Sequence, residues 1–135
     1  MADYGWDTYA STIEARTEMV AENPDLVRRF VEASIIGWYN FMYGDNQAAF
    51  DLITAANPEM TNEKLVAEVQ LMKDLGIVDS GLTLEQGIGA MDPERTAAFL
   101  ASLEDAGILE PGAVDLDLVA NYNFVNQGFG VDLRK

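Results

Sequence analysis

The sequence predicts a mostly α protein, a helical bundle of about five helices with one short N-terminal strand. Apolar residues recur at intervals of three and four through most of the chain, which is the period of a helix with one buried face. Residues that start or stop helices, chiefly Pro, Asn, Asp and Gly, stand at the ends of these periodic segments. Since 135 residues suffice for one hydrophobic core, we expect residues 1–135 to form a single domain.

The N-terminal part contains the predicted strand and the start of the longest helix. Residues 8–16 are rich in Thr, Tyr and Ile in partial alternation, which is typical of a strand. The triplet Asn-Pro-Asp at residues 23–25 then provides a cap, a proline at the first helical position and an acid near the helix dipole. This helix should run to about Tyr43 and stop at Gly44.

We expect this long helix to be the central and most buried one, with Trp38, Tyr39 and Phe41 in the core. Its inward stripe is predicted to comprise Val27, Phe30, Val31, Ile35, Trp38 and Met42, widened by Leu26, Ile36 and Phe41.

Four more helices are predicted after it, the last of them short. Their expected caps are Asp45 or Asn46, Thr61, Asp92 and Asp115. In the helix after Thr61, we expect Leu65, Val69, Met72 and Leu75 to face inward. Gly76 and Gly107 each follow a periodic segment and precede an isoleucine, Ile77 or Ile108. This pattern is typical of a helix that turns at a left-handed glycine and buries the next apolar residue against its own last turn.

The charge of the chain excludes some function classes. Twenty-three acidic and eight basic residues give a net charge of −15, which repels nucleic acids and anionic lipids. A well-solvated surface is the simplest explanation, with a salt-adapted host or a cationic partner as alternatives. No segment approaches the ~20 apolar residues of a membrane span, so we expect no membrane insertion. Residues 1–9 lack the basic and apolar regions of a secretory signal, which predicts a cytoplasmic location if the chain is the full natural product.

The residue types present argue against catalysis. The chain has no Cys and no His, which removes thiol nucleophiles, the commonest general base and the commonest zinc ligands. We therefore expect no enzyme, no cofactor and no metal site. Asp115 and Asp117 are better explained by a helix cap than by a metal pair. The glycine pairs at 87–89 and 128–130 follow no strand, so we interpret them as turns and not as phosphate loops.

Three aromatic residues, Tyr4, Trp6 and Tyr9, crowd the N-terminal segment outside any helical stripe. Aromatic faces presented by a loop can hold a planar ligand, so these three are the candidate ligand-binding residues.

Residues 22–38 carry a recognisable pattern: an acid-Asn-Pro start, then a Phe and a small residue on the core face, then Gly-Trp. With residues 2–5, 57–61, 87–91 and 124–126, this stretch resembles the NMT1/THI5-like periplasmic substrate-binding proteins of ABC transporters. The similarity is to the C-terminal part of that family, whose full-length members have two α/β lobes (the type II periplasmic binding protein fold). The resemblance implies that this chain is part of one lobe, and that the segment around Tyr4 and Trp6 lies close to the ligand cleft.

The resemblance implies a ligand-binding component, or a C-terminal fragment of one, of an ABC importer, with an ABC permease as its partner in full-length relatives. The ligand would be a small organic molecule such as a thiamine-pyrimidine precursor, riboflavin, a sulfonate or a nitrate-type ligand. The location it implies is periplasmic or at the cell surface. The alternative is a stand-alone helical self-association module without a transport ligand. An enzyme like the yeast pyrimidine synthases of the same superfamily is disfavoured, because their reaction depends on a His that is absent here.

A homodimer is also expected. An isolated strand leaves backbone hydrogen-bonding groups unpaired, and helices without the sheet of the full-length family would expose apolar stripes. We expect the face around Ile13 and part of the helix from Val27 to Met42 to be buried between two copies.

Overall fold

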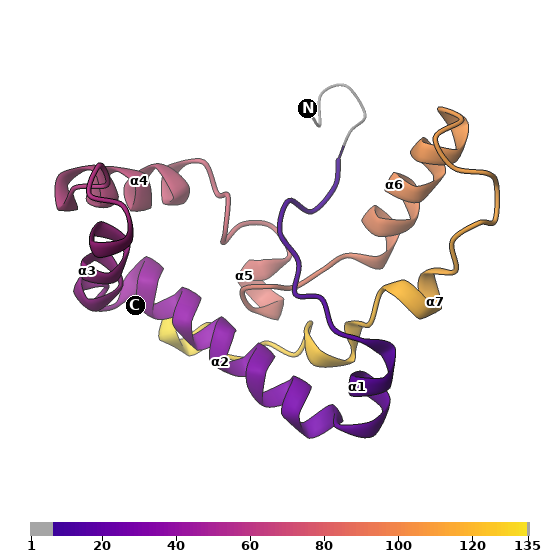
Figure 1. Cartoon of the computed structure of the whole chain (residues 1–135), viewed down its shortest axis with the longest axis horizontal. Coiled ribbons are helices and arrows are strands. Elements are labelled where there is room, and N and C mark those ends of the chain that lie inside the picture. The colour runs from indigo at the N-terminus through magenta and orange to yellow at the C-terminus, as the bar shows by residue number, and fades with distance from the viewer. Residues whose placement is uncertain (1–6, 135) are drawn as a thin grey trace. The chain divides into compact units, whose positions relative to one another are not determined.

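The computed structural model describes residues 7–134 and is mostly helical, which confirms the predicted class (Figure 1). The α-helices are α1 Thr17–Glu22, α2 Pro24–Tyr43, α3 Gln47–Ala56, α4 Asn62–Asp74, α5 Thr83–Gln86, α6 Pro93–Asp105 and α7 Leu116–Val119. Two 3₁₀ turns, η2 Tyr122–Phe124 and η3 Val131–Leu133, lie near the C-terminal end. The five expected helices correspond to α2, α3, α4, α6 and α7. The helices α1 and α5, of six and four residues, are additional.

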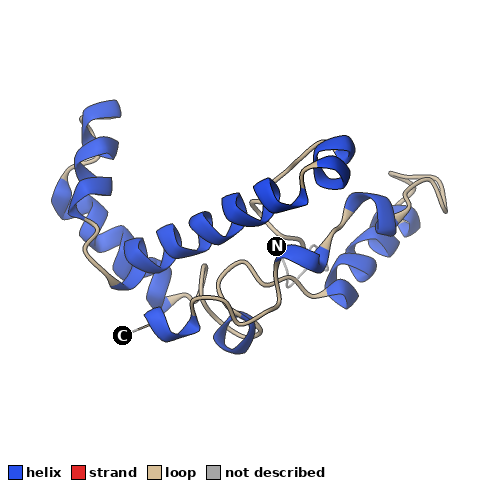
Figure 2. Ribbon diagram, turned by 90° about the horizontal axis from the view of Figure 1, so that it is seen from below, coloured by secondary structure: helices blue, strands red, loops and turns tan. Residues whose placement is uncertain are grey.

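The strand expected within residues 8–16 does not form, and Figure 2 shows no strand in the part of the chain that the structure describes. Residues 8–16 are irregular and largely exposed up to the start of α1. The prediction was wrong because β propensity is expressed only where a neighbouring strand completes the ladder of hydrogen bonds. Between residues 7 and 134 no such neighbour exists.

The chain divides into two compact units. Of the described residues, 7–31 and 91–124 belong to unit 1, and 32–90 and 125–134 belong to unit 2. In unit 1, none of the described side chains of α1, α6 or α7 is fully buried. Unit 2 contains most of the buried core residues. The expectation of a single domain over 1–135 stays a prediction.

The inward stripe of α2 differs in part from the predicted one. The buried residues are Val27, Val31, Ile35, Tyr39 and Met42, spaced by four, four, four and three. Tyr39 is 1% exposed, whereas Trp38, predicted to be core, is 44% exposed. Tyr39 can be buried at little cost because its hydroxyl accepts a hydrogen bond from the backbone N–H of Ile88, at 3.2 Å, inside unit 2.

A second cluster of unit 2 joins α3 and α4. Phe50 of α3 packs with Leu65 and Val69 of α4, and Phe41, Ile53 and Met60 lie against them. Burying an apolar side chain of this size contributes roughly 1.5–3 kcal/mol, which is enough to fix the two helices against each other. The prediction that Leu65 and Val69 face inward is confirmed, whereas Leu75 is exposed.

The predicted helix ends are mostly confirmed, because capping depends on neighbouring residues. The Thr61 hydroxyl accepts from the N–H of Lys64, and the Asp92 carboxylate accepts from the N–H of Glu94. Gly76 and Gly107 adopt the left-handed conformation, with φ of 60° and 67°.

Both glycine ends have the hydrogen bonds of a Schellman motif. The N–H of Ile77 donates to the carbonyl of Met72, and the N–H of Ile108 donates to the carbonyl of Leu103. Ile77 and Ile108 themselves are 65% and 58% exposed, so the expected burial of these isoleucines is wrong.

Candidate functional site

Of the three candidate ligand-binding residues, Tyr4 and Trp6 lie outside the described residues, and Tyr9 lies inside unit 1. The Tyr9 hydroxyl accepts a hydrogen bond from the backbone N–H of Asp92, at 2.6 Å. Asp92 is the cap of α6, so the hydroxyl fixes the N-terminal segment to the start of this helix. Tyr9 is half-buried there.

Arg95, on the first turn of α6, organises the surroundings of Tyr9. Its guanidinium carbon lies 4.3 Å from the centre of the Tyr9 ring, a cation–π contact. The same guanidinium donates to the carbonyl oxygen of Thr8 at 3.0 Å and pairs with the Asp7 carboxylate at 2.6 Å. The Nε atom of Arg95 is buried and has no hydrogen-bond partner among residues 7–134, which is an uncommon arrangement for this group.

Next to this contact lies an open depression of about 380 Å³. It is lined by Asp7, Asp92, Glu94, Arg95, Ala98 and Phe99. Phe99 is four residues after Arg95 and therefore lies on the same face of α6. The lining thus combines an aromatic ring, a guanidinium plane and acidic oxygens. Such a surface suits a flat ring that stacks on Phe99 or Arg95 and donates hydrogen bonds to carboxylates.

A second open depression, of about 490 Å³, lies in unit 2 between α3 and the start of α4. Its lining comprises Asp51, Thr54, Ala55, Thr61 and Asn62, none of them aromatic. Because it offers no surface for stacking, it is the weaker candidate for a planar ligand.

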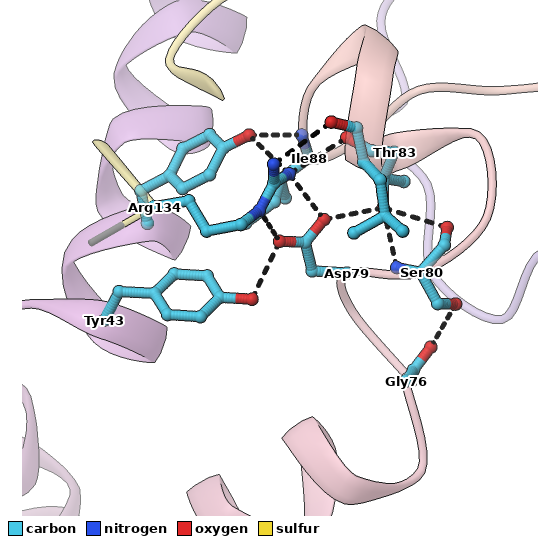
Figure 3. Close-up of polar contacts among 9 residues, drawn as sticks. Tyr43, Gly76, Asp79, Ser80, Thr83, Ile88 and Arg134 are labelled. Atoms are coloured by element: carbon cyan, nitrogen blue, oxygen red, sulfur yellow. Dashed lines mark hydrogen bonds and ion pairs between the residues drawn. The ribbon is translucent and has the colours of Figure 1, made fainter. Parts of the chain in front are cut away.

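The most connected polar cluster of the described chain centres on Asp79 and Arg134 in unit 2 (Figure 3). The Asp79 carboxylate accepts from the Nε of Arg134 at 2.6 Å, the Tyr43 hydroxyl at 2.7 Å and the Thr83 hydroxyl at 2.8 Å. Its side chain is 1% exposed, against 25% for Arg134. Arg134 also donates to the carbonyl oxygens of Thr83 and Leu84.

The ionisation of this cluster follows from its contacts. Burial acts to raise the pKa of Asp79, but hydrogen bonds from Arg134, Tyr43 and Thr83 outweigh it, so the pKa lies below its usual 3.8. Burial, and then the hydrogen bond to Asp79, raise the pKa of Tyr43 above its usual 10.0. The carboxylate is therefore charged and fully paired, which is the arrangement of a structural cluster.

The glycine pairs at 87–89 and 128–130 lie in turns, which confirms that interpretation. The N–H of Ala90 donates to the carbonyl of Gly87 at 3.0 Å, and the N–H of Val131 donates to the carbonyl of Gly128 at 3.3 Å. The N–H of Gly128 donates to the carbonyl of Gln86 at 2.9 Å. At Gly130, which has a φ of 78°, an added Cβ would lie 2.8 Å from the Tyr39 ring. Glycine is needed here because backbone and ring approach closely.

The acidic pair Asp115 and Asp117 lies at the start of α7. The Asp115 carboxylate accepts from the N–H of Asp117 at 3.0 Å, which confirms the helix cap. Among residues 7–134 no group of three or more carboxylates or other ligand side chains is placed to hold a metal ion. In the same range no helix has the length and apolar content needed to cross a membrane.

Sequence reasoning missed Arg95 and the Asp79 cluster. One sequence signal was available for Arg95, because it follows the Asp92-Pro93 helix start and so belongs to the first turn of α6. No local signal connects Asp79 with Arg134, which is 55 residues away.

Comparison with known proteins gives one informative similarity. The chain is 31% identical over 123 residues to the riboflavin-binding protein RibY of Chloroflexus aurantiacus. The matched region covers 88% of this chain and 34% of the relative, so the chain spans about a third of that protein's length. No family model matches the chain. No solved structure matches it either.

Proposed function

We propose that this chain is a ligand-binding component, or a part of one, that serves an ABC importer for a small organic molecule and performs no catalysis. The observation that carries the proposal is the 31% identity, over 88% of the chain, to a protein named for riboflavin binding. The resemblance of residues 22–38 to the NMT1/THI5-like substrate-binding proteins supports the importer, its permease partner and a periplasmic or cell-surface location.

The depression beside Tyr9 supports a planar ligand, and a flavin is the first candidate. A flat ring placed there would stack on the Phe99 ring and on the outer face of the Arg95 guanidinium. Tyr9 supports the inner face of that guanidinium at 4.3 Å, and Asp7 fixes its edge. Hydrogen-bond donors of the ligand would meet the carboxylates of Asp7 and Glu94, which line the same depression.

Titration of riboflavin fluorescence with the purified chain tests the proposal. Stacking on an aromatic or guanidinium plane should quench the emission and raise its polarisation. A dissociation constant below about 100 µM corresponds to more than about 5.5 kcal/mol of binding free energy and would be resolved. Unchanged emission and polarisation up to that concentration would contradict flavin binding by this chain.

Two arginine variants locate the site. Arg95→Ala should weaken binding about tenfold or more, because it removes one stacking plane and leaves Tyr9 and Asp7 without their shared partner. Arg29→Ala is the matched control. Arg29 forms an exposed ion pair with Asp25, four residues earlier on α2, so its loss should leave binding unchanged. Equal weakening in both variants would place the site elsewhere.

Self-association is the second candidate function, and one observation favours it. The face of α2 opposite its buried stripe is exposed and largely apolar.

A further inference from the structure

Residues 7–9, which we call the strap, contact the start of α6 within unit 1. The backbone N–H of Asp92 donates to the Tyr9 hydroxyl at 2.6 Å. Three further contacts are made by the Arg95 guanidinium, which meets the Tyr9 ring, the Thr8 carbonyl oxygen and the Asp7 carboxylate. The next residues, 10–16, are irregular and exposed. We therefore attribute the position of the strap to its contacts with α6.

The strap also forms part of the depression beside it. Asp7 lines the depression, and so does Arg95, whose guanidinium is held by the Tyr9 ring and the Asp7 carboxylate. Tyr9 itself does not line the depression. If the strap detached, the depression would lose the Asp7 oxygens and the support that orients the Arg95 plane. A ligand that contacts both groups therefore binds the docked strap more tightly than the detached one.

The contacts that hold the strap are of modest strength. The side chains of Arg95 and Asp7 are 36% and 56% exposed, and ion pairs this exposed contribute little because water screens them. The buried Nε–H of Arg95 has no acceptor among residues 7–134, which opposes docking, since water would hydrate this donor once the strap detached. The hydrogen bond of the Tyr9 hydroxyl is therefore a substantial share of the free energy that favours docking.

We propose that Tyr9 is a positioning residue, and that docking of the strap onto α6 is coupled to ligand binding in the depression. The inference rests on the proposed function, because the ligand is the planar molecule that stacks on Arg95. A ligand shifts a conformational equilibrium only by its difference in affinity for the two states, and here that difference comes from the contacts with Asp7 and Arg95. The coupling is reciprocal, so a docked strap raises the affinity for the ligand and a bound ligand retains the strap.

Two substitutions of Tyr9 separate the hydroxyl from the ring. Tyr9→Phe removes only the acceptor for the Asp92 N–H and should lower the equilibrium constant for docking about two- to tenfold. The dissociation constant of the ligand should rise by up to the same factor, because it varies inversely with the docked fraction of the chains. Tyr9→Ala also removes the cation–π contact with Arg95, so it should weaken binding by about tenfold or more.

Titration of riboflavin fluorescence with wild type and both Tyr9 variants measures this effect, and Tyr122→Phe is the matched control. Tyr122 is a half-buried tyrosine of unit 1 that lies outside the lining of the depression, so removing its hydroxyl should leave the affinity unchanged. Melting curves of the four proteins should nearly coincide, because detachment of the strap is a local opening that leaves the helices folded. A role in stability alone would instead lower the melting temperature without changing the affinity.

Hydrogen exchange of backbone amides, followed by NMR, measures the coupling in the reverse direction. The Asp92 N–H is protected by the Tyr9 hydroxyl and exchanges when the strap detaches. Riboflavin at roughly ten times its dissociation constant should therefore slow this exchange by up to about tenfold. The matched control is the N–H of Lys64, which donates to the Thr61 hydroxyl at the start of α4 in unit 2. Its exchange rate should be the same with and without riboflavin.

The outcomes separate the coupling from the proposed function. Equal riboflavin affinity in wild type and Tyr9→Ala would overturn the coupling and leave the proposed function standing. Exchange of the Asp92 N–H that saturating riboflavin does not slow would have the same consequence. Weakening of equal size in Tyr9→Phe and Tyr122→Phe would also overturn it, because the effect would not be specific to the strap. An absence of riboflavin binding by the wild type would overturn the proposed function, and the coupling with it.

Discussion

Replacing Asp79 by Asn should destabilise unit 2 severely. The Asp79 carboxylate is 1% exposed and is the acceptor for Arg134, Tyr43 and Thr83. Removing one member of a buried ion pair costs about 3–5 kcal/mol. In the Asp79→Asn variant, Arg134 keeps a quarter of its side chain exposed and retains two carbonyl acceptors. The loss of unfolding free energy should therefore be smaller, about 2–4 kcal/mol. This loss is a large fraction of the 5–15 kcal/mol that is typical of the free energy of unfolding of a domain.

Urea denaturation followed by circular dichroism measures this loss, with Asp51→Asn as control. Asp51 accepts an exposed hydrogen bond from Gln47, so its replacement should change the free energy of unfolding by less than about 0.5 kcal/mol. A loss at Asp79 as small as that at Asp51 would refute the view that this cluster stabilises the fold.

The pH dependence supplies a second check on the same variant. Because the pKa of Asp79 lies below its usual 3.8, its contribution is fully present above that value and is lost as the pH falls through the lower folded-state pKa. The difference between wild type and Asp79→Asn should therefore be constant from pH 5 to 7, within about 0.5 kcal/mol, and shrink below about pH 4. A difference that grows on acidification would contradict the assigned ionisation.

Two further pairs of variants test the core of unit 2 and the turn against it. Gly130→Ala should cost about 2–4 kcal/mol, since the methyl group would meet the Tyr39 ring and φ is 78°. Gly112→Ala, at a position with a similar φ but open space around it, should lower the free energy of unfolding by only about 1 kcal/mol. Thermal melts of both variants measure the two losses, and equal losses would show that the contact with the Tyr39 ring contributes nothing. Tyr39→Ala should cost about 3–5 kcal/mol and Trp38→Ala less than about 2, because only Tyr39 is buried. A larger loss of unfolding free energy for Trp38→Ala than for Tyr39→Ala in urea titrations would contradict this assignment and indicate that Trp38 is the core residue.

Helix ends could be predicted from the sequence because their causes are local. The triplet at residues 23–25 and the pair Asp92-Pro93 supply a cap and a proline within two or three positions, and α2 and α6 begin there. Gly76 and Gly107 likewise turn left-handed within the last turn of their own helices. Each of these features depends on residues fewer than six positions apart.

Features that depend on distant residues were missed or misplaced. Trp38 and Tyr39 are adjacent and both aromatic, and the choice between them depends on the Ile88 amide 49 residues later. The strand at 8–16 had the right residue types but lacked a neighbouring strand among residues 7–134. For the candidate site, Tyr9 was found as an aromatic residue outside any stripe, whereas its contact Arg95 lies 86 residues further along the chain. The roles of Tyr4 and Trp6 stay predictions.

The separation of Asp79 from Arg134 also constrains how the protein acquires its structure during synthesis. Arg134 is added 55 residues after Asp79, which takes about 3–11 s at typical elongation rates. During that interval the carboxylate can accept hydrogen bonds from Tyr43 and Thr83 but has no cationic partner, so packing the segment from 79 to 90 against Tyr39 and Tyr43 would bury an uncompensated charge. The final fold of unit 2 therefore waits for its last residues, and a nascent chain released before Arg134 would remain open at Asp79 and be exposed to proteases.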